Sequence, residues 1–201
     1  MPERAARARL VNVVGVLAGS AAFAAAWWQA RRPDVTDVEE GVMRAVNHAP
    51  DGPYRPVYLV MQLGSLGGGL AAGALLTRRD RRTGIATMAA VTAAWGASKV
   101  VKRFTGRGRP EAHLEEIVIR GAPQRGLGFP SGHAGVATVV ALAAAPVVPR
   151  PVAVVVAGAA VTTVLARVYV GAHLPLDVAG GAAMGVALGC VAREAAGLRS
   201  R

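Results

Sequence analysis

The sequence contains little charge and almost no cysteine. Charged residues make up 17% of the 201 positions, against about 25% in an ordinary globular domain, while 53% of the residues are hydrophobic. The one cysteine, Cys190, excludes a disulfide framework within the chain and leaves its redox compartment open. A chain of this length and composition fits one domain or one compact bundle of membrane helices.

Acidic residues are also scarce, with 12 Asp and Glu against 23 Lys and Arg, so the formal net charge is +11. A basic chain suits a nucleic acid, a membrane surface or an anionic substrate. The sequence has no basic helical stretch interleaved with aromatic residues, which argues against a nucleic-acid partner. Its histidines also lack a compact group of carboxylates of the kind that holds a pair of metal ions, so we expect no metal and no cofactor.

Long apolar runs dominate the rest of the sequence. A transmembrane helix needs about 20 mostly apolar residues, and six segments reach or approach that length. We therefore predict an all-α, integral-membrane bundle of six transmembrane helices that forms a single domain over residues 1–201. The predicted helices occupy residues 10–30, 57–76, 84–101, 131–148, 152–170 and 175–192.

The first of these segments has two interpretations. Its basic start and its "AAFAAA" stretch are typical of a signal peptide, which would be cleaved. Its length, and the pair Trp27 and Trp28 placed like an interface anchor, favour a retained helix instead. Both interpretations place residue 31 outside the cytoplasm.

Glycines recur four residues apart within the apolar runs. This spacing lets two helices in lipid approach closely, although a chain rich in glycine and alanine also produces it by chance. The pairs are Gly15 with Gly19, Gly69 with Gly73, Gly181 with Gly185, and Gly185 with Gly189.

The orientation in the membrane follows from the arginines between the runs. The short stretch "TRRDRRTG", residues 77–84, is the most arginine-dense connection, and such connections stay in the cytoplasm. The amino and carboxyl termini are then expected in the cytoplasm as well. Residues 31–56, 102–130 and 171–174 fall on the outer side.

Three polar clusters lie where outer segments meet predicted helices: "KRFTGRGRP" at 102–110, "GFPSGHAG" at 128–135 and "ARVYVGAHLPLD" at 166–177. Each cluster alone has an ordinary explanation. The first, which includes Arg107, fits a run that binds lipid headgroups, the second a helix start, and the third a loop with a helix cap. We do not expect all three clusters to occur in this order by chance, and ionisable groups at membrane depth usually mark function.

Together the three clusters resemble the motifs of the type 2 phosphatidic acid phosphatase superfamily, also called PAP2, in its membrane lipid phosphatase branch. The motif-bearing core covers about residues 84–192, and residues 1–83 supply N-terminal helices and an outer loop. One departure is Ala166, because the family usually has serine before the arginine of the third motif. The departure removes one hydroxyl near the phosphate and puts rate or substrate preference in doubt.

Phosphate-ester hydrolysis needs strong stabilisation of negative charge. Lys102, Arg109 and Arg167 offer three cations from three segments, and arginine suits bidentate contact with phosphate oxygens. Ser131 and Gly132 begin a helix, whose backbone N–H groups can bind the same phosphate.

The resemblance assigns the proton chemistry to two histidines. In the family the histidine of the third motif, here His173, attacks phosphorus, and the histidine of the second motif, here His133, protonates the leaving oxygen. Asp177 lies four residues after His173 and can accept a hydrogen bond from its other ring nitrogen, which fixes the tautomer. His133 could then activate the water that breaks the phosphohistidine.

We therefore expect a metal-independent lipid phosphatase in a bacterial cell membrane, with its active site on the extracytoplasmic face. Polyprenyl phosphates or diphosphates, phosphatidic acid and phosphatidylglycerol phosphate are candidate substrates by resemblance, and the oligomeric state stays open. One alternative is a vanadate-dependent haloperoxidase-like enzyme, although those relatives are soluble. Another is a non-catalytic lipid-phosphate binder or transporter, which would need neither a nucleophile nor an acid.

Two outer stretches have amphipathic patterns. Residues 34–50 predict a short amphipathic helix. Residues 111–125 fit either an interfacial helix or lid, or an irregular loop, because Leu114, Ile117 and Val118 lie at helical spacing.

Overall fold

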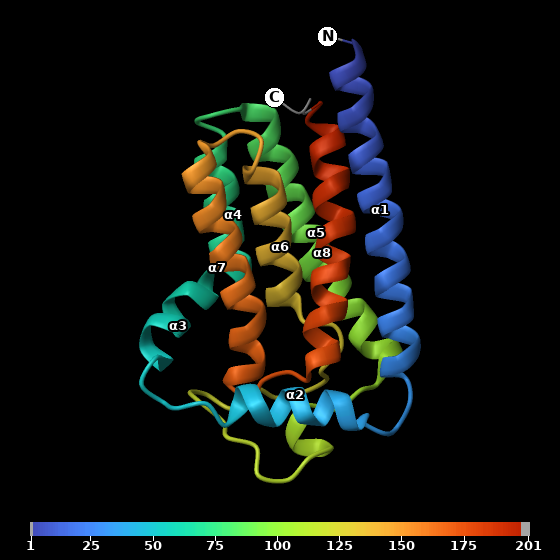
Figure 1. Cartoon of the computed structure of the whole chain (residues 1–201), viewed down its shortest axis with the longest axis vertical. Helices are drawn as coiled ribbons and strands as arrows, with labels where there is room; N and C mark the ends of the chain where they lie inside the picture. The colour runs from blue at the N-terminus through green and yellow to red at the C-terminus, as the bar shows by residue number, and fades with distance from the viewer. Residues whose placement is uncertain (1, 198–201) are drawn as a thin grey trace.

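The computed structural model describes residues 2–197, and every regular element within that range is helical (Figure 1). The all-α prediction is therefore confirmed. The elements are α1 (Pro2–Ala30), α2 (Asp37–Asn47), α3 (Tyr54–Met61), the 3₁₀ turn η1 (Gln62–Gly64), α4 (Leu66–Leu76), α5 (Arg81–Thr105), the 3₁₀ turn η2 (Pro110–Ala112), α6 (Gly132–Ala144), α7 (Arg150–Tyr169) and α8 (Pro175–Ala195).

Helices α6 and α8 form the centre of the bundle. Helix α6 packs against α5, α7 and α8, while α1 lies along the outer side of α8 and α4 packs on α5 (Figure 1). Apolar side chains such as Val91 of α5, Val139 of α6 and Met184 of α8 fill the space between them. The outermost helix, α1, exposes many apolar side chains, as expected for a helix that faces lipid.

Four helices are long and apolar enough to cross a membrane, namely α1, α5, α7 and α8. The pair α3 and α4 adds a fifth crossing if it is counted as one span, since the two parts are bent by 65°. Helix α6 has only 13 residues, which is about 20 Å of helix against a hydrocarbon core of about 30 Å. The count of six transmembrane helices is therefore not established by length and composition.

Ser65 interrupts the segment that the sequence predicts as one helix over residues 57–76. Its backbone is extended, with φ −71° and ψ 156°, and its side chain accepts a hydrogen bond from the amide of Gly68 at 2.9 Å. Serine in this role starts a new helix, so α4 begins in a different direction from α3. The break leaves α3 inclined away from the bundle, beside the end of α7 (Figure 1).

The glycines at four-residue spacing lie at helix contacts. A Cβ atom added at Gly19 of α1 would come within 2.7 Å of the backbone nitrogen of Ala187 in α8. A Cβ added at Gly185 of α8 would come within 2.5 Å of the carbonyl oxygen of Gly135 in α6. These pairs therefore allow backbones to approach more closely than any larger residue would permit.

Gly185→Ala should therefore destabilise the bundle, because a methyl group at this position must push α6 and α8 apart. We expect a cost of about 1–3 kcal/mol, read as a lower thermal midpoint in detergent. Gly158→Ala on α7 is the matched control, since a Cβ at Gly158 meets no atom within 4 Å. Equal thermal midpoints for the two variants would contradict this account of the α6–α8 contact.

The polar clusters gather at one end of the bundle. Helix α2, η2 and the chain that connects α5 to α6 lie at this end, together with the turn between α7 and α8 (Figure 1). The start of α1, the α4–α5 connection with its exposed arginines, and the end of α8 lie at the opposite end. The two groups of segments are thus separated by the length of the bundle.

The two amphipathic stretches behave differently. The predicted helix over residues 34–50 is confirmed as α2, which buries Met43 and exposes Val38 and Val42. The interfacial helix over residues 111–125 is not formed, and the stretch is irregular after η2. Its side chains Leu114 and Ile117 instead pack into the apolar cluster beneath α2, so their spacing serves core packing rather than a helix face.

Candidate active site

The chain after α5 turns back across the end of the bundle. Gly106 ends the helix with a left-handed backbone, φ +70°, which directs the following residues towards the α7–α8 turn. Nη1 of Arg109 then donates to the carbonyl oxygen of Ala172 at 2.5 Å. Nζ of Lys102 donates to the carbonyl oxygens of Leu127, at 2.9 Å, and Gly128. The first and third motifs therefore meet, and the lysine ties the second to them.

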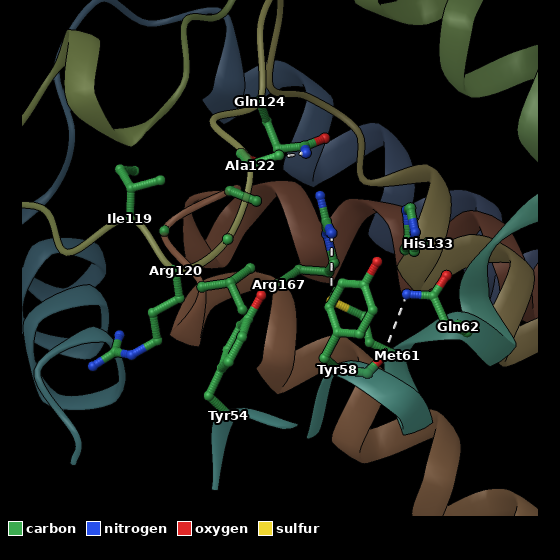
Figure 2. Close-up of a pocket in the computed structure, with 14 residues that line it drawn as sticks. Tyr54, Tyr58, Met61, Gln62, Ile119, Arg120, Ala122, Gln124, His133 and Arg167 are labelled. Atoms are coloured by element: carbon green, nitrogen blue, oxygen red, sulfur yellow. Dashed lines mark hydrogen bonds between the residues drawn. The ribbon is translucent and has the colours of Figure 1, made fainter. Parts of the chain in front are cut away.

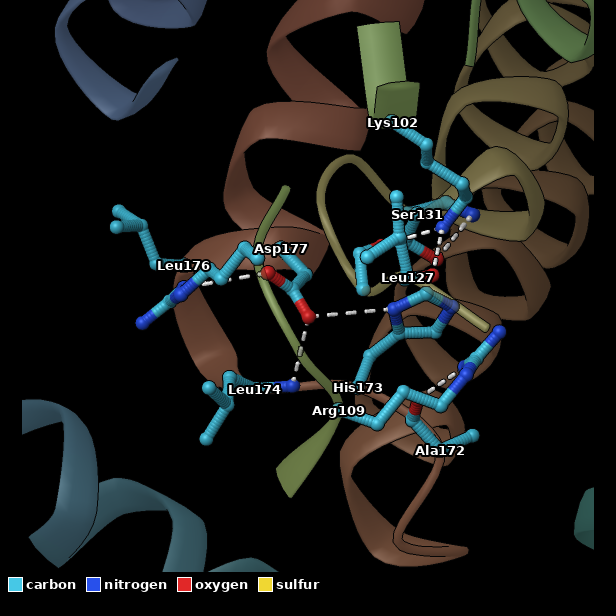
Figure 3. A network of polar contacts seen from close by, with 12 residues as sticks. Lys102, Arg109, Leu127, Ser131, Ala172, His173, Leu174, Leu176 and Asp177 are labelled. Atoms are coloured by element: carbon cyan, nitrogen blue, oxygen red, sulfur yellow. Dashed lines mark hydrogen bonds and ion pairs between the residues drawn. The ribbon is translucent and has the colours of Figure 1, made fainter. Parts of the chain in front are cut away.

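His173 and Asp177 form a buried pair (Figure 3). Nδ1 of His173 lies 3.3 Å from Oδ2 of Asp177, and the same oxygen accepts from the amide of Leu174 at 3.1 Å. The two side chains are 3% and 0% exposed. With Nδ1–H donating to the carboxylate, Nε2 is the nitrogen left for attack on phosphorus.

The charge state of His173 fits a nucleophile. Burial lowers the pKa of its imidazole well below the ordinary histidine value, and the cations Arg167, Lys102 and Arg109 lower it further. The imidazole is therefore neutral at pH 7. A neutral ring nitrogen carries the lone pair that nucleophilic catalysis requires.

The guanidinium of Arg167 is held at the end of α7 with few partners. The side chain is 4% exposed. Within residues 2–197, Nη1 lies 3.4 Å from Sδ of Met61 and Nε has no hydrogen-bond partner. The amides of Ala172 and His173 both donate to the backbone carbonyl of Arg167 at 3.1 Å, which fixes the α7–α8 turn over this residue. A buried cation with an unpaired donor is suited to bind an anion.

Arg167 and His133 both line a cavity of about 260 Å³ (Figure 2). Its other walls are formed by α3, by η1 and by the segment 119–124. Tyr54, Tyr58 and Gln62 contribute polar atoms to this cavity from α3 and η1. The predicted general acid and one of the predicted phosphate-binding cations therefore line the same cavity.

The start of α6 differs from its predicted role. The hydroxyl of Ser131 accepts a hydrogen bond from the amide of Ala134 at 3.4 Å and caps the helix. The amide of Ser131 donates to the backbone carbonyl of Asp177 at 2.9 Å, so this N–H is already engaged and cannot also bind phosphate. Gly132 is the first residue of α6, where an amide has no acceptor within the helix. The predicted anion contact therefore fits Gly132 better than Ser131.

Two buried residues of the site, Arg107 and Glu39, were not predicted from the sequence. The sequence favoured a headgroup-binding run for Arg107, yet this residue is only 5% exposed. It forms ion pairs with Glu39 of α2 at 2.7 Å and with Asp177 at 3.2 Å. The available signal was an acidic residue in an amphipathic outer helix together with an extra arginine inside the first motif.

Residue Ala166, where the family usually has serine, lies in an apolar cluster with Met61, Tyr169 and Val170. It is almost completely buried.

Within residues 2–197, no group of three or more His, Cys, Asp or Glu side chains has the geometry of a metal site. The cationic and imidazole side chains that line the cavity are Arg120, Arg167 and His133, beside the polar side chains of α3, η1 and Gln124.

Comparison with known proteins identifies the family. A model of the PAP2 superfamily matches residues 83–200. The chain belongs to the PAP2 superfamily. The resemblance inferred from the three motifs is thereby confirmed.

Relatives of this PAP2 chain include mycobacterial phosphatases. The chain is 40% identical over 113 residues to the decaprenylphosphoryl-5-phosphoribose phosphatase of Mycolicibacterium smegmatis, a match that covers 55% of this chain and 59% of that one. It is 34% identical over 131 residues to the phosphatase of the same name from Mycobacterium tuberculosis strain H37Rv, covering 64% and 70%. The chain thus spans 59% and 70% of the length of these two relatives.

Two solved structures share the fold. The phosphatidylglycerolphosphate phosphatase of Bacillus subtilis, a transmembrane PAP2 protein, superposes with a TM-score of 0.72 at 20% identity, covering 89% of this chain and 94% of that one. LpxE of Aquifex aeolicus superposes with a TM-score of 0.74 at 21% identity, covering 81% and 98%. This chain therefore shares their helical fold, and four of its described helices are long and apolar enough to cross a membrane.

Proposed function

We propose that this PAP2 protein hydrolyses a phosphate monoester of a membrane lipid through a phosphohistidine intermediate. The observation that carries the proposal is the position of His173, bound to Asp177 and close to the cations Arg167, Lys102 and Arg109, with Arg167 lining a cavity of about 260 Å³. A phosphate bound to Arg167, Lys102 and Arg109 would lie within reach of the free ring nitrogen. This differs from a binding protein, which has no need of an oriented imidazole.

The reaction has two steps. Nε2 of His173 attacks phosphorus, the bond from phosphorus to the leaving oxygen breaks, and His133 gives a proton to that oxygen. Water then attacks the phosphohistidine, its proton passes to His133, and inorganic phosphate leaves with His173 restored. The arriving phosphate dianion supplies a negative charge that favours protonation of His133.

The leaving group would occupy the cavity next to His133. Its lining of tyrosine and glutamine side chains offers hydrogen bonds to hydroxyl groups, and its 260 Å³ has room for a small sugar or glycerol unit. The relatives at 34–40% identity are named for a decaprenylphosphoryl phosphoribose substrate. We therefore favour a polyprenyl-linked sugar phosphate over phosphatidic acid, whose phosphate is joined directly to diacylglycerol.

The chain would form one domain over residues 1–201 in a bacterial cell membrane. Counting the broken pair α3–α4 and the short α6 gives six crossings, with both termini in the cytoplasm. The arginines of the α4–α5 connection support this orientation by the positive-inside rule. The active site would then open on the extracytoplasmic face.

Phosphate release by the purified protein in detergent tests the proposal. The substrates are a polyprenyl-phosphoryl-ribose 5-phosphate, phosphatidylglycerol phosphate, phosphatidic acid and a polyprenyl diphosphate, each with excess chelator. We expect release in every preparation with chelator, and a kcat/KM for the sugar phosphate about tenfold or more above that for phosphatidic acid. No release from any substrate, or release that stops with chelator, would contradict the mechanism.

A further inference from the structure

Helix α2 crosses the end of the bundle (Figure 1), and one of its carboxylates is buried. This carboxylate belongs to Glu39, which is 8% exposed. Its Oε1 accepts from the amide of Leu176 at 2.8 Å and from Nη1 of Arg107 at 3.1 Å, and its Oε2 accepts from Nη2 of Arg107 at 2.7 Å. Helix α2 lies before residue 83, outside the part of the chain that the family model matches.

The guanidinium of Arg107 connects this carboxylate to the proposed catalytic pair. The same Nη1 that contacts Glu39 also donates to Oδ1 of Asp177 at 3.2 Å. The other oxygen of Asp177 accepts from His173. Contacts therefore run without interruption from Glu39 through Arg107 and Asp177 to the imidazole, and all four side chains are buried.

The net charge of Glu39, Arg107 and Asp177 sets the electrostatic stabilisation that these side chains give to the imidazole of His173. Arg107 and Asp177 alone would form a neutral pair, and a neutral pair offers little stabilisation to an imidazole that gains positive charge. With Glu39 present, the single positive charge of Arg107 is paired with two carboxylates, those of Glu39 and Asp177. The three side chains together therefore carry a net charge of about −1. Burial away from water makes such a charge act strongly over these short distances.

We infer that Glu39 is a positioning residue of the reaction: through Arg107 it orients the Asp177 carboxylate and keeps net negative charge next to His173. It touches neither substrate nor phosphorus. Its effect appears as the phosphohistidine forms, when the ring becomes cationic and needs a partner. The inference rests on the proposed phosphohistidine chemistry.

A purely structural role is the competing explanation, because Glu39 also fastens α2 to the start of α8. The two roles differ in what they change. Loss of a structural contact lowers the amount or thermal midpoint of folded protein, while each folded molecule keeps its kcat. Loss of charge at the reacting imidazole lowers kcat of folded molecules and leaves substrate binding, and hence KM, nearly as it was.

Glu39→Gln is the decisive variant because it keeps the size and one acceptor oxygen but removes the charge. Glu40→Gln is the matched control, since Glu40 is the next residue of α2 and pairs with Arg44 at the partly exposed surface. Per folded molecule we expect Glu39→Gln to lower kcat about 10- to 100-fold with KM within about threefold. Glu40→Gln should keep both constants within about twofold of the wild type.

Glu39→Asp tests whether charge is the property that matters. It restores the negative charge on a side chain one methylene shorter, so we expect a kcat between those of Glu39→Gln and the wild type. A kcat no higher than that of Glu39→Gln would overturn the role of charge. If Glu39→Gln does not fold, Glu39→Met replaces it as the uncharged variant with the same expected loss of kcat, and a wild-type kcat per folded molecule in that variant overturns the inference.

The experiment separates this inference from the proposed function. Equal kcat for Glu39→Gln and Glu40→Gln, in a protein that His173→Ala inactivates, overturns the role of Glu39 and leaves the phosphatase in place. A loss confined to the thermal midpoint of Glu39→Gln does the same. A wild-type protein without phosphatase activity, or full activity in His173→Ala, overturns the proposed function itself.

Discussion

His173→Ala is expected to lower kcat for phosphate release at least about 10⁴-fold, because the variant lacks the only proposed nucleophile. Losses of this size follow when a catalytic nucleophile is removed from a site whose other groups remain. The cations would still bind phosphate, so the variant should retain affinity for the substrate. The measurement is single-turnover release of phosphate from a radiolabelled lipid phosphate by matched amounts of folded protein.

His48→Ala provides the control for this prediction. His48 follows α2, and its ring contacts the carbonyl oxygen of Glu116 at the surface. Its removal should leave kcat within about twofold, since a surface contact of this kind contributes little. The wild type, quenched during turnover, should carry an acid-labile phosphate on the protein, and His173→Ala should carry none. Substantial activity or label in His173→Ala would refute the covalent route.

The residues of the proposed phosphate site were predictable because each motif carries its own signal. Lys102, His133 and Arg167 stand at the ends of apolar runs, where a charge is costly unless it has a use, and Arg109 lies in the same motif as Lys102. The structure brings them to one end of the bundle. Their roles in catalysis remain predictions.

The helices were predicted well where an apolar run is long and uniform. The runs 152–170 and 175–192 correspond closely to α7 and α8. The run 57–76 is instead divided at Ser65, because hydropathy averages over a window and does not register a single capping side chain. The run 131–148 ends early at Ala144, before the prolines at 146 and 149 and the turn around them.

The pair Glu39–Arg107 could not be found from the sequence, since its two members lie 68 positions apart. Charged residues in outer segments are usually solvated, and the sequence gives no sign that α2 folds back over the site. Only the packing of α2 against α7 and α8 brings the carboxylate to Arg107. The amide of Ser131 illustrates the same limit, because its partner, the carbonyl of Asp177, is a contact of the tertiary fold.

Arg167→Lys should lower kcat/KM about 100- to 1,000-fold while leaving the fold intact. A lysine keeps the charge but loses the planar fork that matches two phosphate oxygens. The native side chain has one contact to a sulfur and an unpaired Nε, so few interactions within the protein are lost. We therefore expect a thermal midpoint in detergent close to that of the wild type.

Arg120→Lys should show the opposite balance, although Arg120 lines the same cavity. Its guanidinium is saturated by Asp51 and by the carbonyl oxygens of Asn47, Ala49 and Tyr169 at 2.6–2.7 Å. Each lost hydrogen bond to a charged group costs about 1.5–3 kcal/mol. Because Arg120→Lys loses several of them, the thermal midpoint of the variant should fall clearly. Added vanadate, a phosphate analogue, should raise the midpoint of the wild type and of Arg120→Lys but not of Arg167→Lys. Equal stabilisation of both variants by vanadate would show that Arg167 does not bind the phosphate, and the unpaired donor would need another explanation.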